Sequence, residues 1–157
     1  MSGEGSPADQ PVDARGKRLA IVATRWHAEI TDALLAGAVA TARECGIGDE
    51  DVEVLRAPGA FELPVVAEAL ARSTRVDGIV CLGVVVRGGT PHFDYVCRAV
   101  TDGCLRVSLD HRLPVGFGVL TVDDLAQARE RLDKGREAVR AVLETLTVLD
   151  DIRGRSS

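Results

Sequence analysis

Four short apolar runs, separated by longer stretches with a helical period, dominate the pattern of this chain. The runs predict β-strands at residues 18–24, across Val52, Val54 and Ala57, at Gly78–Val86, and at residues 114–120. The third run, GIVCLGVVV, is almost continuously apolar, which is typical of a strand buried on both faces of a sheet.

Between these runs, apolar or small residues recur at helical spacing. Positions 30, 34, 38, 42 and 45 share one face, so we predict a helix over residues 28–45 that ends at Gly46. The same reasoning predicts three more helical regions, at residues 61–72, at residues 91–109, and from Asp123 and Asp124 to about residue 151.

Strands that alternate with helices favour a parallel sheet, because right-handed crossovers place helices on both of its faces. Four such strands predict an α/β fold, a flavodoxin-like three-layer α/β/α sandwich with a four-stranded parallel sheet. Residues 1–16 are rich in Gly, Ser, Pro and Asp and lack an apolar period. We therefore predict a flexible N-terminal tail at residues 1–16 and a single domain at residues 17–157.

The composition narrows the class of protein. Hydrophobic residues make up 46% and charged residues 27% of the 157 residues, which excludes extended disorder. No apolar run approaches the roughly 20 residues that a membrane-spanning helix needs, so no membrane association is expected. The net charge of −5 gives no basic footprint, so no nucleic-acid partner is expected. The N-terminus lacks the apolar core of a signal peptide, and we expect a cytoplasmic protein.

Four cysteines stand at positions 45, 81, 97 and 104. They form no Cys-x-x-Cys pair and have no histidine at zinc-ligand spacing, so we predict no metal site. Cys81 lies in an apolar run, and Cys97 and Cys104 are seven residues apart on a predicted helix. We interpret all four as reduced core residues of a cytosolic protein.

Chemically distinctive residues follow the predicted strands. In a sheet of this kind, ligands bind beyond the carboxyl ends of the strands. There the chain carries Trp26 with His27 beside it, a carboxylate at Glu62, a glycine-rich turn that ends at Thr90, and His92. The aromatic rings stand beside Gly, Pro and His, which suits either stacking on a flat ligand or packing beneath a loop.

The glycine-rich turn nearly matches a phosphate-binding P-loop. Gly83, Gly88 and Thr90 have the right spacing, but Gly89 stands where the lysine should be, so a nucleoside triphosphate site is not expected. Two glycines before a helix still let backbone N–H groups converge on one anion. The pattern therefore leaves open an anion site and a plain strand-to-helix turn.

Three other features each have a functional and a structural interpretation. His92 could exchange protons beside an anion, or it could cap its helix. Glu62 lies in the first turn of a predicted helix, where the dipole alone stabilises a carboxylate, but it could also accept hydrogen bonds from ligand hydroxyls. A basic cluster near the C-terminus forms either a solvated face or an anion contact from the side; it consists of Arg129, Arg131, Lys134 and Arg136.

Three sequence motifs, with their spacing along the chain, resemble those of one enzyme family, the 6,7-dimethyl-8-ribityllumazine synthases. They are APGAFELP from Ala57, GVVVRGGTPHFDYV from Gly83, and PVGFGVLT from Pro114, with Gln127-Ala128 and Arg131 beyond them. The resemblance runs from about Lys17 to the C-terminal helix. It implies a cofactor-free condensation of 5-amino-6-(D-ribitylamino)uracil with 3,4-dihydroxy-2-butanone 4-phosphate, with release of phosphate and water, in riboflavin biosynthesis.

The resemblance also implies roles for individual residues. His92 would be catalytic and shuttle protons. Gly89, Thr90 and Arg131 would bind the butanone phosphate, and Phe117 would come from a neighbouring subunit of a homopentamer or a multiple of pentamers. Riboflavin synthase is a further expected partner. The positions that would bind the pyrimidine and its ribityl chain are Trp26, Ala60, Phe61, Glu62, Val84, Val85, Val86 and, from the neighbouring subunit, Phe117.

Two departures from the family pattern stand out. Many members have asparagine where this chain has His27, and several extra residues where only Leu132 and Asp133 separate Arg131 from Lys134. His27 and Lys134 are therefore secondary site candidates, and the short link leaves the assembly beyond a pentamer open. Two alternatives to the enzyme are a flavin- or lumazine-binding protein without catalysis and a cage-forming structural homologue.

Overall fold

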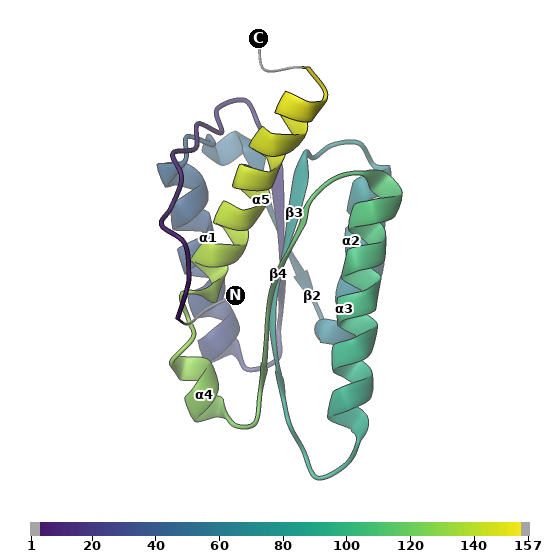
Figure 1. Ribbon diagram of the computed structural model, residues 1–157. Coiled ribbons are helices and arrows are strands. Elements are labelled where there is room, and N and C mark those ends of the chain that lie inside the picture. The colour runs from purple at the N-terminus through teal and green to yellow at the C-terminus, as the bar shows by residue number, and fades with distance from the viewer. Residues whose placement is uncertain (1–3, 155–157) are drawn as a thin grey trace.

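A computed structural model describes residues 4–154 and shows one parallel sheet of four strands (Figure 1). Residues 1–3 of the predicted tail and residues 155–157 of the predicted domain lie outside the described part. The sheet order is β2-β1-β3-β4, and every neighbouring pair runs parallel. The strands are β1 (Leu19–Thr24), β2 (Val52–Ala57), β3 (Gly78–Val86) and β4 (Val115–Val122). The predicted α/β sandwich is confirmed.

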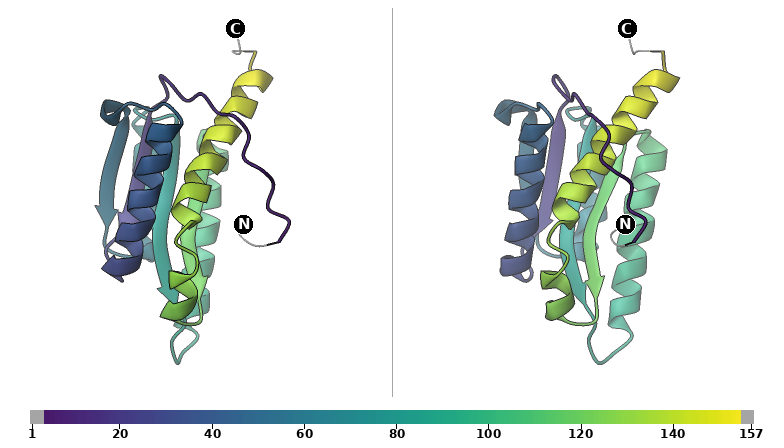
Figure 2. Two further views of the ribbon diagram at one scale, coloured as in Figure 1. Left: turned by 90° about the vertical axis from the view of Figure 1, so that its left-hand side faces the viewer. Right: turned by 60° about the vertical axis from the view of Figure 1, so that its left-hand side comes forward.

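Helices cover both faces of this sheet. Figures 1 and 2 show α1 and α5 on one face and α2 and α3 on the other. The final helical region is divided, because a turn after residue 129 separates a short helix from a long one. The helices are α1 (Ala28–Glu44), α2 (Leu63–Arg72), α3 (His92–His111), α4 (Leu125–Arg129) and α5 (Lys134–Ile152), with 3₁₀ turns at Asp49–Asp51 and Ala60–Glu62.

Alternate side chains of the strands build two separate cores. Ile21 and Leu82 pack with α1 and α5, whereas Val22 and Ile79 pack with α2 and α3. The period of two follows from the pleat of the strands, which points successive side chains to opposite faces. Strand β1 is buried along its whole length, and β4 is an edge strand.

Close contact between α1 and α5 depends on one glycine. A Cβ atom placed on Gly135 would lie 2.1 Å from the carbonyl oxygen of Leu34. The first turn of α5 can therefore approach the backbone of α1 only because position 135 has no side chain. This contact lies at the start of α5, directly after the turn that carries Arg131.

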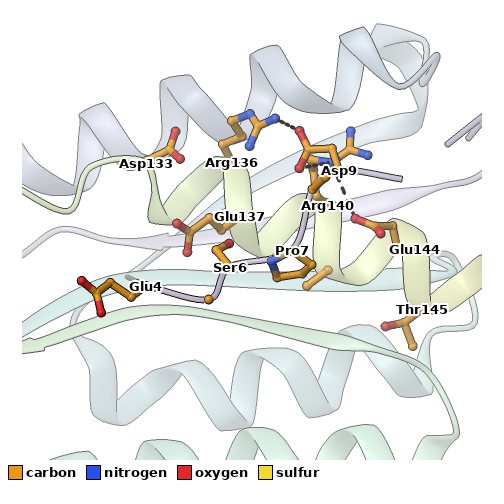
Figure 3. Close-up of a pocket in the computed structure, with 13 residues that line it drawn as sticks. Glu4, Ser6, Pro7, Asp9, Asp133, Arg136, Glu137, Arg140, Glu144 and Thr145 are labelled. Carbon is orange, nitrogen blue, oxygen red and sulfur yellow. Dashed lines mark hydrogen bonds and ion pairs between the residues drawn. The ribbon is translucent and has the colours of Figure 1, made fainter. Parts of the chain in front are cut away.

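The described part of the predicted tail runs along α5 (Figure 3). The Asp9 carboxylate pairs with Arg136 and Arg140, and Arg140 also donates to the Gln10 carbonyl. Ala14 is buried, and its N–H donates to the Cys45 carbonyl at 2.8 Å. Packing against the domain therefore begins before Lys17, while the flexibility of the segment stays a prediction.

The cysteine prediction holds for three of the four residues. Cys45, Cys81 and Cys104 are buried and free, but Cys97 is only half-buried on α3. The interpretation of Cys97 as a core residue is therefore wrong, because its position on α3 lies at the margin of the buried stripe. A hydrogen bond with Cys104, together with burial, raises the pKa of the Cys81 thiol well above its usual range. That thiol is consequently a neutral core group.

Candidate functional site

A cavity of about 620 Å³ lies at the carboxyl ends of the central strands. In the sheet order β2-β1-β3-β4, the chain passes from β1 to β2 on one side and from β3 to β4 on the other. The helices that follow β1 and β3 therefore lie on opposite faces of the sheet. Such a switch point leaves a crevice in open α/β sheets. The lining includes most of the predicted site residues: Trp26, His27, Ala60, Phe61, Glu62, Val84, Val85, Val86, Thr90 and His92.

The aromatic wall of the cavity comes from the segment after β1. Trp26 is 66% exposed, so its indole face is available to a ligand. The Arg25 N–H donates to the Ala57 carbonyl at 3.1 Å, which holds this segment beside the end of β2. A Cβ on Gly59 would lie 3.1 Å from the indole Cδ1 and 3.3 Å from a Glu62 carboxylate oxygen. The indole and the carboxylate therefore flank Gly59 in one wall.

His27 has an unusual backbone conformation for a residue with a side chain. Its φ of 53° and ψ of 62° lie in the left-handed region, and it is the N-cap of α1. The His27 carbonyl accepts the N–H groups of Ile30 and Thr31 at 2.9 and 3.1 Å. Its ring centroid lies 6.2 Å from that of Trp26 at an interplanar angle of 49°. Histidine enters this conformation more readily than most residues, which explains how it fits at this position.

The opposite wall is formed by the turn between β3 and α3. Gly88 and Thr90 line the cavity, and a Cβ on Gly88 or Gly89 would meet nothing within 4 Å. The space above the turn is therefore open to a ligand. The Thr90 hydroxyl accepts the His92 N–H at 3.4 Å, a long hydrogen bond at the start of α3. Gly89 itself is not among the residues that line the cavity.

His92 is the first residue of α3 and faces the cavity. Its ring is exposed, and no hydrogen bond from it to another residue is found within residues 4–154. A ring in that state can serve as a proton donor or acceptor for a bound molecule. The ring is therefore available to a bound molecule, and the proton-transfer role of His92 stays a prediction.

Four predicted site residues lie outside the lining of this cavity: Gly89, which lies in the glycine turn, and three residues from other parts of the chain. Phe117 is on the edge strand β4 and is 38% exposed. The Arg131 guanidinium donates to the Gln127 carbonyl at 2.7 Å, on the turn after α4. Lys134 lies 3.2 Å from the Glu137 carboxylate, and its side chain is only 15% exposed. The structure of one copy thus does not bring these three to the cavity.

Sequence reasoning missed several residues of the lining. Phe93, Tyr95 and Val96 contribute to it, as do Gly59 and Gly88. All five lie inside the motifs given above, and the first three follow His92 at positions one, three and four. The helical period of 3.6 residues places the third and fourth positions on the same face as His92, so this signal could have identified Tyr95 and Val96.

The fold and the cavity define a flavodoxin-like α/β protein whose cavity at the strand ends is lined by an exposed indole, an open glycine turn and an exposed histidine. Comparison with known proteins identifies the family. The 6,7-dimethyl-8-ribityllumazine synthase family matches residues 16–150. The chain is 58% identical to the enzyme of this name from Frankia casuarinae, with 97% of this chain and 98% of that one covered.

Other relatives are similar over nearly their full length. The 6,7-dimethyl-8-ribityllumazine synthases of a Nocardioides species and of Streptomyces coelicolor are 51% and 46% identical, each over 97% of both chains. The chain therefore belongs to the 6,7-dimethyl-8-ribityllumazine synthase family, which is a family of enzymes. In the described part of the chain, no helix is both long and apolar enough to cross a membrane.

Proposed function

We propose that this chain condenses 5-amino-6-(D-ribitylamino)uracil with 3,4-dihydroxy-2-butanone 4-phosphate at the cavity after β1 and β3. The activity is that of the family to which the chain belongs, and neither the binding-protein nor the cage alternative has support. The observation that carries the residue assignment is the cavity itself. It combines an exposed indole, an open glycine turn and an exposed histidine.

The two substrates occupy different walls of the cavity. The flat pyrimidine stacks on Trp26, and backbone groups of Val84, Val85 and Val86 meet its polar edge. The ribityl chain follows the turn of Ala60 and Phe61, and its hydroxyls donate to the Glu62 carboxylate. This arrangement directs the amine of the pyrimidine toward the opposite wall.

The ketone phosphate lies on that opposite wall. Backbone N–H groups of the turn at Gly89 and the hydroxyl of Thr90 bind its phosphate at the start of α3. The amine attacks the ketone carbonyl, and His92 takes the amine proton and returns a proton to the departing oxygen. One water leaves as the imine forms, and phosphate is then eliminated, which leaves a second carbonyl. The ribityl-bearing amine closes the ring on that carbonyl with loss of a second water. Holding both reactants at this distance supplies much of the rate enhancement.

The site is completed by a second copy of the chain. Phe117, Arg131 and Lys134 lie outside the lining of the cavity in their own copy. In a homopentamer, or a multiple of pentamers, Phe117 on the edge strand β4 covers the pyrimidine of a neighbour. Arg131 supplies the cation for the neighbour's phosphate, with Lys134 beside it. The enzyme acts in the cytoplasm, without metal or nucleotide, and delivers its product to riboflavin synthase.

The direct test mixes the purified chain with both substrates and follows formation of the fluorescent lumazine. We expect product without added metal, and the same rate in the presence of a chelator. A His92→Ala variant serves as the matched control. Failure of the wild-type chain to form product would contradict the proposed function, and sedimentation of the same sample reports the oligomer.

A further inference from the structure

Arg87 joins the turn after β3 to the turn after β4. Figure 1 shows these two turns at the same end of the sheet. It follows β3, directly before the glycine turn of the cavity. Its Nε donates to Asp123 Oδ1 at 2.9 Å, and Asp123 is the first residue after β4. The Arg87 backbone N–H also donates to the Val122 carbonyl at 2.9 Å. Backbone and side chain therefore both connect the turn after β3 to the turn after β4.

The same guanidinium also contacts the first turn of α3. Its Cζ lies 4.4 Å from the centroid of the Phe93 ring, and its terminal nitrogen lies 3.7 Å from Asp94 Oδ1. Phe93 is buried and directly follows His92. A planar guanidinium can stack on an aromatic ring while its edge donates to a carboxylate, which an ammonium group does less well. Arg87 thus holds the start of α3 as well as the turn after β4.

From Asp123 the contacts continue to Arg131. The Asp123 N–H donates to the Gln127 side-chain oxygen at 2.7 Å. The Gln127 N–H donates to Asp124 Oδ1 at 2.9 Å and caps α4, and the Gln127 carbonyl accepts from the Arg131 guanidinium at 2.7 Å. One short helix therefore carries Asp123 before its beginning and Arg131 just beyond its end.

We propose that Arg87 is a positioning residue for phosphate binding, which fixes the glycine turn of its own site and the turn that presents Arg131. This inference rests on the proposed function. Arg87 does not line the cavity, and two carboxylates and an aromatic ring already surround its guanidinium. Exposed ion pairs of this kind contribute little to global stability. The effect of the cluster therefore falls on the geometry of the two turns rather than on folding.

The test compares steady-state kinetics of four variants with those of the wild-type chain. Arg87→Ala removes the contacts of the guanidinium with Asp123, Asp94 and Phe93. Arg87→Lys keeps the positive charge but loses the planar guanidinium, and Asp123→Asn removes the negative charge of its partner. Arg75→Ala is the matched control, because Arg75 is another exposed arginine that donates to a carboxylate, Glu53, at 2.8 and 3.0 Å. Binding of inorganic phosphate, measured by titration calorimetry, gives a readout that is independent of turnover.

We expect Arg87→Ala to raise the KM for the ketone phosphate by about five- to tenfold, with the KM for the pyrimidine within about twofold of wild type. Phosphate affinity should fall in parallel, Asp123→Asn should show the same selectivity, and Arg87→Lys should lie between Arg87→Ala and wild type. Arg75→Ala should change nothing. Equal effects on both substrates, or no effect on either, would overturn the inference. Absence of product from the wild-type chain would instead contradict the proposed function.

Discussion

The indole of Trp26 lies against Gly59, so closely that a Cβ at position 59 would come within 3.1 Å of Cδ1 and 3.2 Å of Nε1. Contacts this short require one of the two groups to shift by a few tenths of an ångström. The indole is exposed, so it is the group that moves. We therefore predict that Gly59→Ala raises the KM for the pyrimidine by about two- to tenfold and leaves the KM for the ketone phosphate unchanged.

Gly37→Ala is a matched control for that variant. A Cβ on Gly37 in α1 would meet nothing within 4 Å, so alanine should stabilise the helix by about 0.5–1 kcal/mol without changing either KM. Chemical denaturation measures the stability, and initial rates with each substrate varied measure the two constants. An unchanged pyrimidine KM in Gly59→Ala would show that the indole does not contact this substrate.

His92→Ala should act on turnover rather than on binding. Removing a general acid–base slows kcat by about 10–10⁴-fold, a range that allows for water assuming part of its task. Because His92 is exposed and its ring lacks a hydrogen bond within residues 4–154, the variant should unfold at the same denaturant concentration as wild type. Single-turnover rates at saturating substrate provide the measurement. An unchanged rate would remove His92 from the mechanism.

The strands and the cavity walls could be predicted from the sequence because each depends on local signals. GIVCLGVVV at Gly78–Val86 is apolar enough to specify a central strand, and the rule that ligands bind at strand ends then brings Trp26, Glu62 and His92 together. The left-handed conformation of His27 could not be predicted in this way, because histidine enters that region more readily than most residues but still adopts other conformations far more often.

Other features depend on tertiary contacts that no local pattern encodes. Val12 and Ala14 pack against the core although the surrounding composition is typical of a tail. Phe117 and Arg131 lie outside the cavity of their own chain, and a linear sequence does not distinguish a residue of the same copy from one supplied by a neighbour. The contacts of Arg87 with Phe93 and Asp123 likewise appear only once β3 and β4 are paired.

Arg131→Ala should impair only the phosphorylated substrate. A charge-assisted hydrogen bond contributes roughly 1.5–3 kcal/mol, so we expect the affinity for the ketone phosphate to fall by about 10–150-fold while pyrimidine binding is retained. Titration of each ligand into the variant measures both. Lys134→Ala should be measured in the same way. Because Lys134 pairs with Glu137 and its side chain is mostly covered, we expect a smaller effect on phosphate binding. Equal losses for both ligands would contradict the phosphate assignment.

Mixed oligomers test whether Arg131 acts on a neighbouring copy. If a site takes His92 from one chain and Arg131 from another, a refolded mixture of His92→Ala and Arg131→Ala chains contains some sites with both residues intact. Activity should therefore exceed the sum of the two separate variants. If both residues come from one chain, every site in the mixture lacks one of them, and no activity is regained.

The Asp123 carboxylate should make the stability of the chain depend on pH at the acid end. The hydrogen bond from Arg87 lowers the pKa of Asp123 below its ordinary value of 3.8, and Gln127 lowers it further. A depressed pKa in the folded state contributes stability above the pKa of the unfolded state, and this contribution is lost as the pH falls through the folded value.

We therefore predict that wild type and Asp123→Asn differ by a constant free energy of unfolding between about pH 5 and pH 8, and that the difference shrinks below about pH 4. Urea unfolding at a series of pH values measures it. Because the pair is exposed, the difference should be small at every pH, and a difference that grows as the pH falls would contradict the predicted sign.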